Sequence, residues 1–106
     1  MPMIEVKIPK SIKIGGFTYK IDMSQTRDSE LKNNGNFGEC SVIPRKISIA
    51  TNLHPQQTSE TFIHEVLHSI DDVYGHYQLT EEQCKHLSSG LLQVFEQLGI
   101  RFVCDK

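Results

Sequence analysis

The sequence lacks any apolar run that approaches the roughly 18 residues needed to cross a bilayer as a helix. Its first residues also lack the long apolar segment of a secretory signal. We therefore expect no membrane partner and no export, and the predicted location is the cytoplasm.

Cysteine is scarce, and the three cysteines are widely spaced: Cys40, Cys84 and Cys104. They are odd in number and form no C-x-x-C pair, so we expect reduced thiols rather than a disulfide framework. A structural zinc site built from them with His86 is conceivable, but their spacing matches no zinc finger or ribbon. Buried small side chains are the simpler interpretation.

The sequence also lacks a dense basic stripe. Residues 1–50 carry eight Lys and Arg against five acids, and residues 51–106 carry three against eight, for a net charge of −2. A nucleic-acid-binding domain would be expected to concentrate its basic residues on one surface. We therefore expect no nucleic-acid partner.

The length of 106 residues suits one domain with a single modest core. Alternating apolar and polar residues predict a sheet region over residues 1–51, antiparallel-leaning and with about three to five short strands. The expected strands are residues 3–8, 11–14, 17–23, 39–43 and 46–50. Two packed helices are expected to follow, which gives an α+β fold, and residues 100–103 could add one more strand.

The first helix is predicted over residues 55–75, because Pro55 suits a first helical position and Gly75 a helix end. The second is predicted over residues 80–98. Thr80 and Gln83 have the spacing of a capping box at its start, and Gly99 suits its end.

The first helix contains the sequence His64-Glu65-Val66-Leu67-His68, an H-E-x-x-H motif. Residues four apart share one face of a helix, so both imidazoles can reach one ion. Zinc favours imidazole nitrogen, and a carboxylate beside the first ligand can take a proton from a metal-bound water. The motif therefore predicts two metal ligands, His64 and His68, and one general base, Glu65. Asp71 or Asp72 is a candidate to receive the other N–H group of a ligating imidazole, although both can equally be solvated acids.

This segment resembles the zincin metallopeptidases. His64 to Asp71, followed by Tyr74-Gly75 and by Leu79-Thr80-Glu81-Glu82-Gln83, is similar to a group of very short phage and prophage proteins. These are related in pattern to ImmA/IrrE-type and minimal gluzincin peptidases. The resemblance covers about residues 44–98, and it implies a zincin-like fold encoded by a phage or prophage and acting in a bacterial host cell.

The resemblance also calls for a third protein ligand. A third histidine at the metzincin position is absent, because residue 74 is Tyr, whereas gluzincins take a Glu from a following helix. Helical periodicity turns Glu81 toward the first helix more than Glu82, so Glu81 is the first choice and Glu82 the reserve. The remaining alternatives are His76, Asp71, Asp72 and His86.

The function implied is zinc-dependent hydrolysis of peptide bonds, with a peptide or protein substrate such as a phage or host regulator. By resemblance, strand 46–51 is expected to line the cleft. Its edge either offers pairing to an extended substrate or is covered by the loop at residues 26–37. Oxyanion stabilisers are sought among Tyr74, His76 and Tyr77. The alternative is a non-catalytic zinc-binding phage accessory or regulatory module, in which the metal staples two helices.

Overall fold

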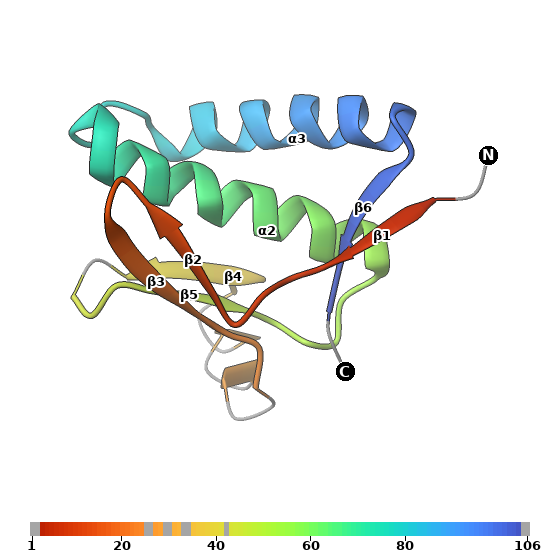
Figure 1. Ribbon diagram of the computed structural model, residues 1–106, viewed down its shortest axis with the longest axis horizontal. Helices are drawn as coiled ribbons and strands as arrows, with labels where there is room; N and C mark the ends of the chain where they lie inside the picture. The colour runs from red at the N-terminus through yellow and green to blue at the C-terminus, as the bar shows by residue number, and fades with distance from the viewer. Residues whose placement is uncertain (1–2, 25–26, 29–30, 33–34, 42, 105–106) are drawn as a thin grey trace.

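The computed structural model describes residues 3–24, 27–28, 31–32, 35–41 and 43–104. The prediction of an α+β domain with several short strands and two packed helices is confirmed (Figure 1). In chain order the elements are β1 (Ile4–Lys7), β2 (Ser11–Ile14), β3 (Phe17–Asp22), β4 (Gly38–Ser41), β5 (Lys46–Ile49), α2 (Pro55–Ile70), η1 (Asp71–Gly75), α3 (Glu81–Gln97) and β6 (Ile100–Val103). Residue 42, within the predicted strand 39–43, lies outside the described residues. No helix in the described part of the chain is both long and apolar enough to cross a membrane.

The main sheet has four strands in the order β2-β3-β5-β4. The pairs β2/β3 and β4/β5 are antiparallel and the central pair β3/β5 is parallel, so the sheet is mixed. A tight turn at Gly15 and Gly16, both with positive φ, joins β2 to β3 as the Gly-Gly sequence predicts. The strand predicted to offer its edge, residues 46–51, is instead β5 in the interior of the sheet. The edge strand on this side is β4. The prediction was wrong because strand order depends on pairing between distant segments, which local sequence patterns do not encode.

A second, two-stranded sheet joins the two ends of the described chain. β1 pairs in parallel with β6, so residues 100–103 form the additional strand. Figure 1 shows this pair crossing beside the end of α2 where that helix begins. Phe102 of β6 packs against Phe62 of α2 and Phe95 of α3, with ring centroids 5.0 and 5.6 Å apart, and so ties both helices to this sheet.

The core lies between the main sheet and α2, which rests on one face of it (Figure 1). Its buried members are Ile8, Ile14, Tyr19, Ile47, Ile49 and Phe62. The apolar residues of α2 and η1 are only partly buried: Ile63 is 6% exposed, whereas Ile70 and Tyr74 are 40% and 67% exposed. The sheet-facing side carries Glu65 and Ser69 instead, and both are buried. Amphipathic periodicity missed this side because it marks apolar contacts and not a buried polar site.

The connection from α2 to α3 is unusual in its backbone. α2 runs into the π-helical turn η1, which ends at Gly75, and the left-handed residues that follow are His76 and Tyr77, with φ of 54° and 61°. The buried Asp71 carboxylate accepts the backbone N–H groups of Gln78 and Leu79. Gly75 therefore ends the helical run as predicted, but the left-handed position falls one residue later.

α3 begins as the capping box predicts. Thr80 accepts the Gln83 backbone N–H through its hydroxyl, and the Gln83 side chain accepts the Thr80 N–H in return. Together with the Asp71 contacts, these bonds fix where the first residue of α3, Glu81, lies relative to α2.

Candidate metal centre

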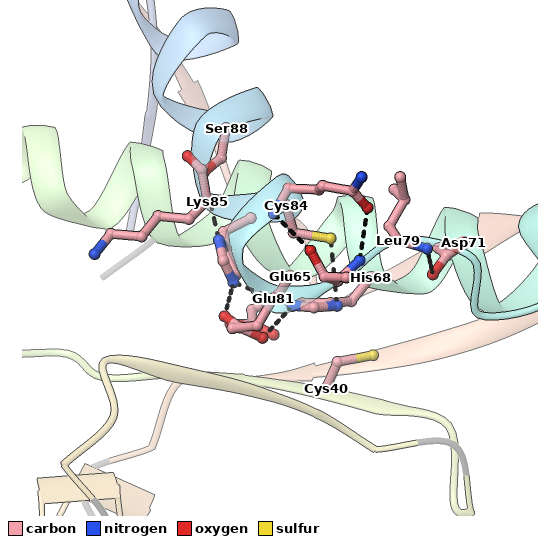
Figure 2. Close-up of polar contacts among 12 residues, drawn as sticks. Cys40, Glu65, His68, Asp71, Leu79, Glu81, Cys84, Lys85 and Ser88 are labelled. Atoms are coloured by element: carbon pink, nitrogen blue, oxygen red, sulfur yellow. Dashed lines mark hydrogen bonds and ion pairs between the residues drawn. The ribbon is translucent and has the colours of Figure 1, made fainter.

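α2 and α3 bring three ligand atoms of the right type together. His64 and His68 lie one turn apart on α2, with their Nε2 atoms 3.1 Å apart. Glu81, at the start of α3, places Oε1 2.6 Å from Nε2 of His64 and Oε2 2.9 Å from Nε2 of His68. Figure 2 shows the Glu81 carboxylate reaching the imidazoles. These three residues can hold a metal ion.

The spacing of these atoms fits a small tetrahedral ion. Ligands about 2.0–2.1 Å from a tetrahedral zinc ion lie roughly 3.3 Å from one another. The observed separations of 2.6, 2.9 and 3.1 Å are slightly shorter, and a small outward shift of the exposed Glu81 side chain lengthens the two that end on its carboxylate. Glu81 is 74% exposed, whereas His64 and His68 are 15% and 24% exposed, so the adjustable member is the carboxylate.

Of the candidate third ligands, Glu81 is the one whose carboxylate lies against the two imidazoles within the described residues. Glu82, His76, Asp71, Asp72 and His86 are all outside the group of convergent ligand atoms. A simple antiparallel helix pair would place His68 level with a residue well inside α3. The π-turn and the left-handed pair His76-Tyr77 instead carry the chain back along α2, so that the first turn of α3 meets the histidines.

The Nδ1 atoms of both imidazoles, which do not contact Glu81, face α3. Nδ1 of His64 lies 3.4 Å from Oγ of Ser88, and Nδ1 of His68 lies 3.6 Å from Sγ of Cys84. The expected partners, Asp71 and Asp72, do not contact the rings. Asp71 is engaged by the backbone of the connection, and Asp72 accepts the Tyr19 hydroxyl at 2.5 Å. Periodicity placed these acids by angle alone and could not anticipate the π-turn that redirects them.

The Ser88 contact fixes the protonation of His64. The Ser88 hydroxyl donates its one hydrogen to the Lys85 carbonyl at 3.0 Å, so toward His64 it can only accept. Nδ1 of His64 therefore carries the hydrogen, and in the neutral ring Nε2 presents a lone pair toward the Glu81 oxygen 2.6 Å away. Both atoms are thus placed to act as ligands of one ion.

The Glu65 side chain reaches toward β4 of the sheet and is buried, with 6% exposed. Burial raises the pKa of Glu65 to about 8, and the negative charges of Glu81 and Glu39 add to this shift. Gly38 makes room for it, because a Cβ atom at that position would lie 2.6 Å from Thr61 and 3.2 Å from Cγ of Glu65.

These groups line a cleft of about 290 Å³ between α2 and the β4 edge of the sheet. Its walls contain Asn36, Gly38, Glu39, Cys40, Glu65, His68, Asp72, Tyr77 and Glu81. Figure 2 shows Cys40 of β4 separated from the cluster of Glu65, His68 and Glu81. A buried carboxylate and a metal-ligating imidazole thus open into the same space.

Only one of the three candidate oxyanion stabilisers lines this cleft. Tyr77 does so, and its hydroxyl donates to the Asp72 carboxylate. Tyr74 instead lies against Gly15 at the tip of the β2-β3 hairpin, and His76 is exposed in the connection. The three cysteines are free thiols, as expected.

Searches with protein-family models, among curated proteins and among solved structures find no match to this chain.

Proposed function

We propose that this chain is a zinc-dependent metallopeptidase in which His64, His68 and Glu81 hold the ion and Glu65 is the general base. The observation that carries the proposal is the convergence of three ligand atoms, two of which belong to residues His68 and Glu81 in the wall of a cleft that also contains a buried carboxylate. Two imidazoles and one carboxylate form a donor set that zinc uses in catalytic sites, where a fourth position is left to water.

When bound, zinc supplies Lewis-acid polarisation of the substrate carbonyl and lowers the pKa of its water toward neutrality. The Glu65 carboxylate accepts a proton from the attacking water and passes it to the amine nitrogen as the peptide bond breaks. Burial alone favours the protonated form of Glu65, whose pKa is raised to about 8, and a cation held by the three ligands would favour the carboxylate that accepts the proton. The Tyr77 hydroxyl, at the cleft wall, turns from Asp72 and donates to the carbonyl oxygen as negative charge develops on it.

β4 supplies a means of holding the substrate. Within the described residues it pairs with β5 on one side only, and it lines the cleft through Gly38, Glu39 and Cys40. The free edge of a strand offers N–H and C=O groups to an extended peptide. We therefore propose that a peptide or protein segment binds in extended form along β4. The family resemblance adds a phage or host regulator as the class of protein to test.

The test uses zinc-loaded protein and a mixture of unstructured peptides, with cleavage followed by mass spectrometry. Glu65→Gln should lower turnover by about 10²–10⁴-fold because the proton acceptor is lost, and zinc binding should be retained. Glu82→Gln is the matched control, because Glu82 is an exposed acid outside the ligand group and should leave turnover unchanged. Equal behaviour of wild type and Glu65→Gln, with zinc bound and no cleavage by either, would overturn the proposal in favour of a non-catalytic zinc module.

A further inference from the structure

α3 presents an exposed apolar stripe that has no role in the metal centre. Its members are 46%, 37%, 50% and 61% exposed, in the order Leu87, Leu91, Val94 and Leu98. Their spacing of four, three and four residues keeps them on one side of the helix over about 16 Å. This is the spacing of a seam between two packed helices, and we call these four residues the α3 seam. The side of α3 that packs on α2 is a different one and carries Cys84, Ser88 and Leu92.

The charges of α3 avoid the seam. At about 100° per residue, the four charged side chains of the helix lie about 110–170° from the centre of the seam. They are Glu81, Glu82, Lys85 and Glu96. The solvent-side flank of the seam carries uncharged Gln83, Gly90 and Gln97. Two identical seams can therefore meet without placing like charges opposite each other. Repulsion between two copies of a chain with net charge −2 is thus kept away from the contact.

Gly90 has no role within one copy of the chain. It lies in the interior of α3, where Gly is unfavourable relative to Ala, and a Cβ atom there would meet nothing within 4 Å. It flanks Leu91 in the middle of the seam. A residue without a side chain at this point allows the backbone of a second helix to approach closely.

The seam can pair with a second, reversed seam. If two α3 helices run antiparallel about a point between residues 90 and 91, Leu87 lies opposite Val94, Leu91 opposite Gly90 and Leu98 opposite Gln83. A large side chain then faces the gap left by a glycine, on both sides of the axis. We propose that the α3 seam binds a second copy of this chain, antiparallel and about a two-fold axis between Gly90 and Leu91.

The surrounding surface supports this arrangement. Ile4 of β1 is 63% exposed, and its backbone N–H donates to the Gly99 carbonyl, one residue beyond Leu98, at 2.6 Å. Apolar surface thus continues past the end of the seam. Glu81 lies on the other side of α3, so the metal cleft stays open in the dimer and association does not depend on metal.

Sedimentation of the whole chain over a range of concentrations tests the proposal. Wild type should show a monomer–dimer equilibrium, and Leu91→Glu should weaken it by about tenfold or more because a charge is buried without a partner. Gly90→Leu should also weaken it while circular dichroism shows an unchanged fold, since the monomer has space there. Ile43→Glu is the control: Ile43 is 92% exposed and outside the seam, so the dimer should persist.

Two further variants test the orientation. Leu87→Glu and Val94→Lys should each dimerise poorly alone but associate when mixed, because antiparallel pairing places the Glu of one copy opposite the Lys of the other. Parallel pairing would not bring these two residues together. The proposal is overturned if the wild type stays monomeric at its highest soluble concentration, because the seam would then bind a different protein. Equal weakening by Ile43→Glu, or failure of the mixed pair to associate, overturns it as well.

Discussion

Oε1 of Glu81 lies 2.6 Å from Nε2 of His64, which joins the first turn of α3 to the middle of α2. The contact is possible because the connection between the helices folds back through a π-turn and two left-handed residues. One carboxylate thereby joins the two imidazoles of α2 in a group that could hold a metal ion.

The choice between Glu81 and Glu82 can be tested directly. Glu81→Gln should weaken zinc binding by more than the roughly 10–100-fold that loss of an outer hydrogen-bond partner causes, because a charged ligand is removed. Glu82→Gln removes the same charge from the neighbouring position and should have little effect. Competition with a chromogenic chelator measures both affinities. A larger loss for Glu82→Gln than for Glu81→Gln would contradict the assignment.

Ser88 should tune the metal site through His64. Ser88→Ala removes the acceptor that holds the hydrogen on Nδ1, so we expect zinc affinity to fall by about 10–100-fold. Ser89→Ala is the matched control, because Ser89 bonds Glu60 at 2.7 Å and does not touch the imidazoles. The same chelator competition applies, with thermal unfolding of the metal-free proteins to show that the fold is retained. Equal zinc affinities of the two variants would show that Ser88 does not affect the metal site.

The hydrogen bond from Tyr19 to Asp72 should contribute to stability in a pH-dependent way. Tyr19 is fully buried, and Tyr19→Phe should cost about 1.5–3 kcal/mol of unfolding free energy near neutral pH, as expected for a bond to a charged acceptor. The bonds from Tyr19 and Tyr77 lower the pKa of Asp72 in the folded protein. Their contribution to the free energy of unfolding is therefore fully present at pH values above about 3.9, the pKa of Asp in the unfolded chain, and is lost as pH falls through the pKa of Asp72 in the folded protein.

The loss of stability at alkaline pH is expected from the ionisation of Tyr19 itself. Burial, followed by the bond to Asp72, raises the pKa of Tyr19 to about 12. Its stabilisation is therefore complete below the unfolded value of about 10 and is lost as pH rises toward 12. The difference between wild type and Tyr19→Phe should shrink at both extremes. Urea unfolding with a chelator present measures it, with exposed Tyr74→Phe as control. A difference that is constant from acid to alkaline pH would contradict this explanation.

Some of this site could be predicted from sequence because the signals are local. The spacing of His64 and His68 on a helix, and the capping box of Thr80 and Gln83, depend on neighbouring residues only, and the structure forms both. Glu81 was favoured over Glu82 by its angle on the helix, although helix spacing alone argued for a residue further along α3. The backbone of residues 71–77, which resolves that conflict, has no recognisable sequence pattern.

Other features depend on contacts between distant segments. The interior place of β5 and the edge position of β4 follow from a parallel β3/β5 pair that no local pattern signals. Burial of Glu65 follows from Gly38 on a strand that is remote in sequence. Ser88 and Cys84 lie on the side of α3 that faces α2. Their contacts with the imidazoles could not be predicted, because these depend on how the two helices are aligned along each other.

X-ray absorption of the zinc-loaded protein, with the zinc content per chain determined on the same sample, identifies the metal ligands. We expect one zinc per chain, two imidazole ligands, and only nitrogen and oxygen atoms in the first coordination sphere. His68→Ala should reduce both the zinc content and the imidazole signal. A sulfur ligand from Cys40 or Cys84, or a chain that purifies and remains without stoichiometric zinc after loading, would contradict this expectation.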